Sequence, residues 1–166
     1  MKEQTELTGK PKDDLKAMRI LTAALSIGVV LFALVMVFIN QLIKTPPLAG
    51  NKLLDDRNTS LGITAIFGSV SIVAARFLYR KRVNIIKESG KLLNDKLNQY
   101  RTVLILYLAI CEAAAMFSII FFFLTGNFII LTITVLMLIM MFSKMPVPGR
   151  LIRELDLDWK EQQELE

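Results

Sequence analysis

Histidine is absent from this chain of 166 residues, and cysteine occurs only once, as Cys111. Without histidine the chain lacks the side chain that most often serves as a general base and as a metal ligand. The sequence also contains no nucleophile elbow, phosphate-binding loop, HExxH motif or cysteine pair. A single cysteine cannot form a disulfide within the chain. We therefore expect neither catalysis nor a bound metal or cofactor.

Charged residues are almost missing from four apolar runs. Hydrophobic residues make up 54% of the chain, and the mean hydropathy is +0.50, well above that of an ordinary soluble domain. The fourth run is short for a membrane span, but it follows Thr125-Gly126-Asn127, a tight-turn signal that leaves no room for a soluble excursion. The sequence therefore predicts an all-α fold with four transmembrane helices, at about residues 20–40, 61–80, 102–125 and 128–143.

Basic residues are distributed unequally between the two sides of these predicted helices. Seventeen of the twenty Lys and Arg residues fall in segments 1–19, 76–101 and 144–166. The positive-inside rule then places both termini in the cytoplasm, as in a multi-pass protein of the inner (plasma) membrane. The pI near 9.4 reflects this topology, and we expect no nucleic-acid binding because no basic soluble face is evident.

The basic residues also predict which lipids the chain contacts. Besides the bilayer itself, we expect the anionic lipids of the inner leaflet to gather at the end of the second predicted helix. The cations expected to attract them are consecutive: Arg80, Lys81 and Arg82.

Polar segments flank the predicted transmembrane helices. Residues 1–19 are expected to form a partly disordered cytoplasmic leader. The middle segment predicts either a surface amphipathic helix or a cytoplasmic extension of the neighbouring helices, with a break at Ser89-Gly90. Its apolar residues fall on one helical face: Ile86, Leu93, Leu97 and Tyr100.

Residues 144–166 are predicted to form a cytoplasmic, amphipathic tail with an acidic end. Pro146 and Pro148 stop the fourth predicted helix, because proline cannot continue it. A short helix is expected from Arg150 to Glu166. Its apolar residues are spaced four apart: Leu151, Leu155 and Trp159.

Glu112 is the only carboxylate within the four apolar runs, and it lies near the middle of the third. An acid at the centre of a membrane helix costs roughly 2.5 to 3.5 kcal/mol on insertion scales, so such residues usually face a bundle interior, a partner or a water-filled path. Glu112 is therefore the first candidate for a functional residue. We expect its carboxyl group to serve either as interhelical hydrogen-bonding glue or as a proton carrier.

Several polar side chains are predicted as partners of Glu112. Arg76 lies about one turn inside the cytoplasmic end of the second helix, where it either extends to the lipid headgroups or forms an ion pair with Glu112. Four hydroxyl groups are expected at the depth of the acid: Ser69, Ser71, Thr132 and Thr134. Small residues on either side predict that the second and third helices pack closely: Ala65, Gly68, Ser69, Ala109, Ala113 and Ala114.

Two resemblances involve the third helix. The stretch from Arg101 to Leu106, followed by Glu112-Ala113, resembles the carboxylate-bearing helix of the rotary ATP synthase proteolipid (c) subunits, where an Arg-Thr-x-Leu-Ile stretch precedes the proton-carrying Glu by the same interval. By this resemblance Glu112 would be an ion-exchanging carboxylate. The second helix departs from that family, since only Gly62 and Gly68 stand where the family has a glycine ladder.

The second half of the chain resembles a family of small, uncharacterised four-helix bacterial inner-membrane proteins. The shared features are Tyr100-Arg101, Glu112-Ala113, the Leu-Thr-Gly-Asn turn at 124–127, and the proline-terminated last helix with its amphipathic tail. This resemblance covers about 65 residues and carries no activity to transfer.

Together these observations favour an accessory or interaction subunit of a membrane complex, acting as a homo-oligomer or within a larger assembly. Four short helices leave little interior for a substrate cavity. The alternative is proton or cation translocation through an oligomer, with Glu112 as the carrier.

Overall fold

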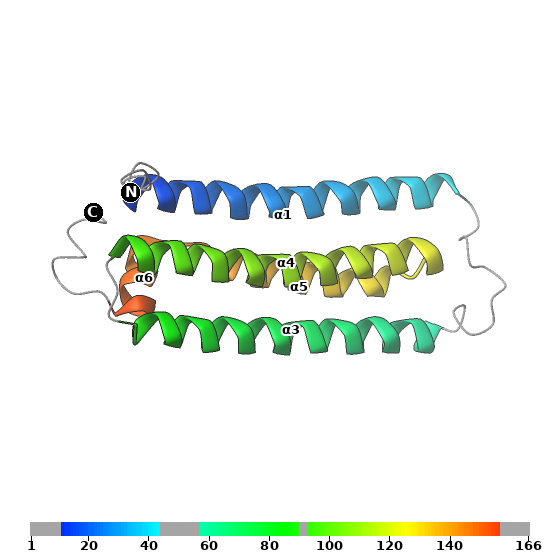
Figure 1. Cartoon of the computed structure of the whole chain (residues 1–166). Helices are drawn as coiled ribbons and strands as arrows, with labels where there is room; N and C mark the ends of the chain where they lie inside the picture. Colours follow the sequence, from blue (N-terminus) through cyan, green and yellow to red (C-terminus); the bar gives the residue numbers. More distant parts are fainter. Residues whose placement is uncertain (1–10, 44–56, 90–92, 157–166) are drawn as a thin grey trace, which may run out of the picture.

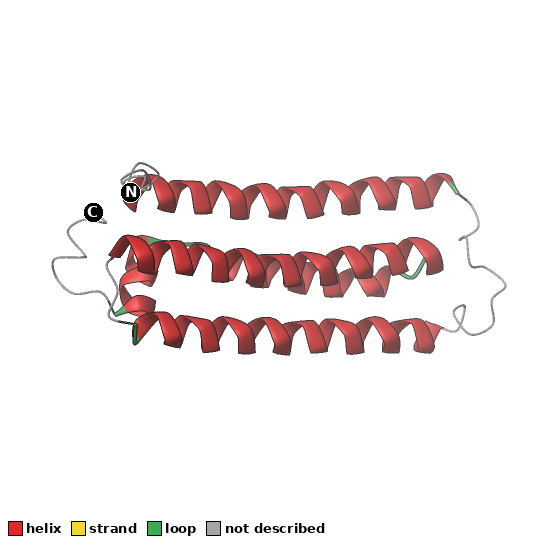
Figure 2. Cartoon of the chain, in the orientation of Figure 1, coloured by secondary structure: helices red, strands yellow, loops and turns green. Residues whose placement is uncertain are grey.

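The computed structural model describes residues 11–43, 57–89 and 93–156. Within these ranges 92% of the residues are helical and none is in a strand (Figure 2), which confirms the all-α prediction. The elements are α1 (Pro11–Leu42), α3 (Arg57–Lys87), α4 (Leu93–Thr125), the 3-10 turn η1 (Phe128–Ile130), α5 (Leu131–Ser143) and α6 (Pro148–Leu155).

Three of the helices, α1, α3 and α4, are long and apolar enough to cross a membrane. A shorter apolar stretch, Phe128–Ser143, combines η1 and α5. Large apolar side chains cover the outer surfaces of α1 and α3; Leu34 and Val73, for example, are 61% and 67% exposed. A soluble protein would bury such surfaces, so these helices indicate a membrane protein.

The helix α4 is the centre of the bundle. It runs between α1 and α3, with α5 behind it (Figure 1), and it contacts all three of these helices. Half of its most apolar segment is buried, compared with 17% for α1 and α3. The start of α1, the end of α3 and the helix α6 lie at one end of the bundle (Figure 1), which we call the α6 end.

The most extensive interface joins α3 and α4, so the predicted close packing of these two helices is confirmed. Aromatic side chains form much of this interface, with ring centroids 4.2 Å apart for Phe67 and Phe117 and 5.3 Å apart for Tyr79 and Tyr107. The prediction of a small-residue interface was wrong. Four of the six small residues are exposed, because they lie on the wrong faces of their helices: Ala65, Ser69, Ala109 and Ala113.

Of the other two small residues, Gly68 packs against α5 rather than α4. A Cβ atom at Gly68 would lie 3.0 Å from Cγ2 of Ile133, so tight a contact that the Ile133 side chain would have to move by a few tenths of an ångström. Ala114 is buried, and it packs in an apolar cluster with Val29 of α1 and Met137 of α5. The two residues thus bring α1, α3 and α5 close to the centre of the bundle.

The connection between α4 and α5 is a tight hairpin, as the sequence predicted. Gly126 has a φ of 68°, a left-handed conformation that glycine adopts without strain. The side chain of Asn127 then accepts a hydrogen bond from the backbone N–H of Ile129 at 3.2 Å, which caps η1.

The segments outside the apolar runs are largely helical. The described part of the predicted leader, from Pro11 onward, is the first part of α1. In the middle segment, α3 continues to Lys87 and α4 begins at Leu93, which confirms the helix-extension interpretation and the break near Ser89. All four of its predicted face residues are buried: Ile86, Leu93, Leu97 and Tyr100.

The tail helix α6 is shorter than predicted. Leu151 and Leu155 are buried, as their spacing indicated, but the helix ends at Leu155 because Asp156 adopts the left-handed conformation with φ 51°. Trp159 and the acidic end of the tail lie outside the described residues.

Candidate functional site

Glu112 lies half-buried on α4, between the buried Cys111 and the exposed Ala113. Within the described parts of the chain, its carboxyl group forms no hydrogen bond or ion pair. It therefore sits at the edge of the packed face of α4, where it borders an exposed stripe of the same helix.

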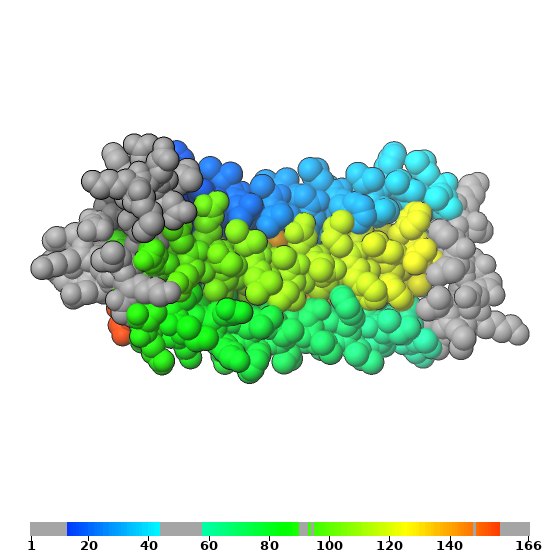
Figure 3. Space-filling model, viewed as in Figure 1, coloured from blue at the N-terminus to red at the C-terminus, as the bar shows by residue number. Residues whose placement is uncertain are grey.

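The residues of this stripe are four, four and seven positions apart, as expected for one face of a helix. It consists of Ile105, Ala109, Ala113 and Ile120, all of which are exposed. The face of α4 that lies between α1 and α3 is open to the viewer in Figure 3. Glu112 is thus accessible beside two alanines over which another helix could pack closely.

The structure does not bring the predicted serine and arginine partners to Glu112. Ser69 and Arg76 are exposed, and their spacing of seven residues places them on the same face of α3 as the exposed Val73. Ser71 is half-buried, and neither serine forms a hydrogen bond with another described residue. No ion pair joins Arg76 to Glu112.

The structure corrects the depth that we predicted for the two threonines of α5. The hydroxyl of Thr134 lies 2.6 Å from that of Ser118, in a fully buried hydrogen bond between α5 and α4. Ser118 is six residues beyond Glu112, or about 9 Å along the helix. Thr132 is exposed and donates to the backbone carbonyl of Ile129 at 2.6 Å.

A second carboxylate, Glu154 on α6, lies in a polar cluster at the α6 end. It accepts hydrogen bonds from the hydroxyl of Tyr79, from the hydroxyl of Tyr100 at 3.1 Å, and from Nζ of Lys144 at 3.0 Å. The two tyrosine hydroxyls are 2.9 Å apart, and the Lys144 ammonium lies 4.0 Å from the centre of the Tyr79 ring. Four elements therefore meet at one side chain: α3, α4, α6 and the end of α5.

These contacts also set the protonation of Glu154. Partial burial alone would raise the pKa of its carboxyl group. The hydrogen bonds from Tyr79 and Lys144, the charge of Lys144 and the bond from Tyr100 outweigh burial and hold the pKa below its usual value. Glu154 is thus an ionised anchor that holds α6 against the bundle.

Backbone contacts strengthen this anchor. Arg19 of α1 donates from Nε to the carbonyl of Pro146 at 2.8 Å, and Arg150 of α6 donates to the carbonyl of Ser143. The short linker between α5 and α6 is therefore tied to the first helix as well.

Sequence reasoning did not identify this cluster. A signal was available, because Leu151, Glu154 and Leu155 lie three and four residues apart and so share one face of α6. An acid on the apolar face of a helix needs a partner, and Tyr79 and Tyr100 lie near the helix ends that could supply one.

Neither carboxylate is part of a metal site, since no group of three or more metal-binding side chains occurs among the described residues. Comparison with protein-family models, curated proteins and solved structures finds no match. The function must therefore be argued from these residues themselves.

Proposed function

We propose that the chain is an integral membrane protein that acts as an interaction or accessory subunit and pairs with a second copy of itself through α4. In this proposal Phe128–Ser143 crosses the inner membrane together with the three long helices, and both termini are cytoplasmic. The arrangement of the bundle supports this topology, because α1 begins and α6 lies at the same end (Figure 1). The excess of basic residues in the segments assigned to that end supports a cytoplasmic location for it.

One observation carries the proposed pairing: no other described residue is a partner of Glu112, and the stripe beside it is exposed. In lipid an unpartnered acid would remain costly. A neutral carboxyl group is both a donor and an acceptor of hydrogen bonds, so it is complementary to a second copy of itself across a twofold axis. Ala109 and Ala113 allow the two α4 helices to approach closely around this pair.

Substitution of Ala113 by Leu tests the pairing. We expect Ala113→Leu to abolish the dimer, because the larger side chain separates the two helices. Ala65→Leu is the matched control, since it adds the same volume to an exposed alanine on α3. Oligomeric state is measured by mass photometry in lipid nanodiscs. The proposal fails if the protein is monomeric, or if both variants behave alike.

Proton or cation translocation is the second candidate, and it rests on the same unpartnered carboxyl group, which is free to exchange a proton. Purified wild-type protein and Glu112→Gln are reconstituted into vesicles, and ion flux is measured alongside oligomeric state. Flux that is lost in a folded Glu112→Gln variant would favour translocation over the accessory role. No flux in either protein would leave Glu112 as a contact residue.

A further inference from the structure

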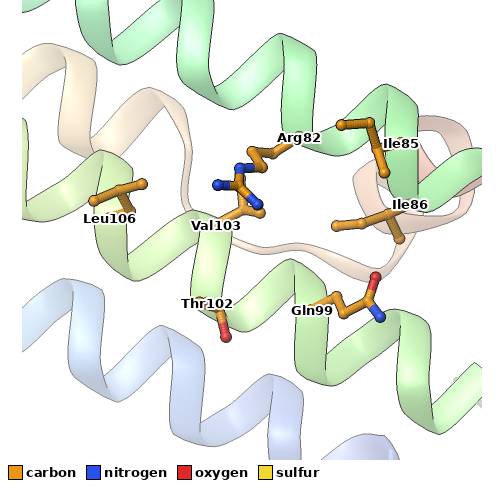
Figure 4. A pocket seen from close by; sticks show the side chains of 7 residues that line it. All are labelled: Arg82, Ile85, Ile86, Gln99, Thr102, Val103 and Leu106. Atoms are coloured by element: carbon orange, nitrogen blue, oxygen red, sulfur yellow. The ribbon is translucent and has the colours of Figure 1, made fainter.

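A groove lies between α3 and α4 near the α6 end of the bundle, with a volume of about 410 Å³. That volume is within the range of sites that bind small molecules. Arg82 and Ile86 of α3 form one wall, and Gln99, Val103 and Leu106 of α4 form the other (Figure 4).

Among the described residues that line the groove, Arg82 is the only charged one. Its side chain extends from α3 across the groove toward Val103 of α4 (Figure 4). Within the described residues it forms no ion pair or hydrogen bond. The groove therefore presents a guanidinium group whose five donors are available to a ligand.

The wall formed by α4 changes from apolar to polar along its length. Leu106 and Val103 lie toward the apolar middle of α4, and Gln99 lies one turn further toward the α6 end. A phospholipid has the same order of groups, with acyl chains, then a phosphate, then a polar headgroup. Arg82 reaches α4 at Val103, where the apolar residues of the α4 wall meet Thr102 and Gln99 (Figure 4), so a phosphate held by Arg82 lies at this border.

We propose that this groove is a binding site for one anionic phospholipid, whose phosphate is held by the Arg82 guanidinium while an acyl chain packs on Val103 and Leu106. Arginine suits this role because its planar donors match phosphate oxygens in pairs. The inference rests on the proposed insertion of the helices into a membrane. It adds a single defined site to the diffuse attraction that a run of basic residues exerts on anionic lipids.

Arg80 provides a matched control for this site. It has the same charge and lies two residues from Arg82, but it borders a separate hollow of about 390 Å³ on α3, where Arg76 and Lys81 are further cations. Both arginines are exposed, so replacing either by Gln removes one positive charge without removing a hydrogen bond or ion pair among the described residues.

Binding is measured by the fluorescence anisotropy of a labelled phosphatidylglycerol added to the full-length protein in detergent. About 0.5 M NaCl screens the diffuse attraction of surface charges. We expect Arg82→Gln to weaken binding about ten-fold, the lower end of the range for the loss of a charged hydrogen-bonded contact, because Arg82 is exposed. Arg80→Gln should change it less than about two-fold. Labelled phosphatidylcholine should bind more weakly than phosphatidylglycerol.

Three results would overturn the inference: equal losses in the two variants, no loss in Arg82→Gln, or displacement of the lipid by an equal concentration of glycerol phosphate. The last result would mean that the groove binds a free phosphate ester. Insertion is measured separately, as the fraction of protein retained in alkali-washed phosphatidylcholine vesicles. If the wild-type protein is not retained in the vesicles, the proposed function is contradicted. If it is retained but Arg82→Gln and Arg80→Gln bind the lipid with equal affinity, only the proposed groove site is contradicted.

Discussion

Glu112 and Glu154 are two half-buried carboxylates in opposite surroundings. Glu112 lies in the apolar middle of α4 and has no hydrogen-bond partner in the described chain. Glu154 lies on α6 and accepts hydrogen bonds from two tyrosines and a lysine. The described part of the bundle therefore supplies partners to the acid at its end and none to the acid at its centre.

The difference indicates that the two residues have different roles. A carboxylate held by several donors orders the elements that carry those donors, so Glu154 fixes the position of α6. A carboxyl group with no internal partner does not stabilise the monomer, so its retention in an apolar helix needs another explanation, such as contact with a second copy. Substitutions at the two sites should consequently change stability in opposite directions.

The largest effect is expected from Glu154→Ala, which leaves two hydroxyls and one ammonium group without their acceptor. We expect a loss of about 2–3 kcal/mol, below the range for fully buried pairs, because the Glu154 side chain is 19% exposed. Stability is measured by thermal unfolding in detergent, followed by the near-ultraviolet circular dichroism of the tyrosines. All three tyrosines of the chain contribute to the cluster around Tyr79, so this signal reports on it.

Arg153→Ala is the matched control on α6. Arg153 is exposed and forms no ion pair or hydrogen bond within the described residues, so its loss should change stability by less than about 0.5 kcal/mol. Equal losses in Glu154→Ala and Arg153→Ala would show that the cluster does not anchor α6.

A smaller effect of the opposite sign is expected from Glu112→Leu. Replacing a half-buried acid without partners by an apolar residue should stabilise the monomer by about 1–2 kcal/mol, less than the full cost of a central charge. The same substitution should weaken the dimer, because it removes the proposed carboxyl pair. Unfolding of the monomer in excess detergent separates the two effects. A loss as large as that of Glu154→Ala would mean that Glu112 has a partner within the chain.

The sequence was sufficient to predict the helices, because periodicity and hydropathy are local properties. The buried faces of the middle segment, at Ile86 and Leu97, were predicted correctly for the same reason. The depth of Thr134 was not, since it depends on how far the tight turn at Gly126 shifts α5 along α4. The prediction that Ala109 and Ser69 face the interface between the second and third helices was wrong, because several faces of a uniformly apolar helix are equally plausible contact surfaces.

The site around Glu154 could not be derived from any single segment. Its donors come from α3, α4 and the end of α5, which lie up to 75 residues away in the chain. Only the return of the short helix α6 across the end of the bundle brings them together. Glu112, by contrast, was conspicuous in the sequence because it interrupts an apolar run, and its exposure then depended on which helices surround α4.

The smallest effect is expected from acid, which protonates Glu154 without removing its oxygen atoms. Because the pKa of Glu154 is lower in the folded protein than its unfolded value of about 4.3, its contribution to stability is fully present above that value. It is lost as the pH falls through the folded pKa. The protonated acid still accepts hydrogen bonds from the tyrosines but loses its charge interaction with Lys144, so the loss of stability should be smaller than in Glu154→Ala.

Release of α6 in acid is measured by trypsin cleavage at Arg150 and Arg153, which requires access to α6. Samples are therefore incubated at each pH in cross-linker, which traps released α6, and are then digested at neutral pH. Acid should increase cleavage of the wild type more than that of Glu154→Gln, whereas an equal increase in both would show that another group controls the response.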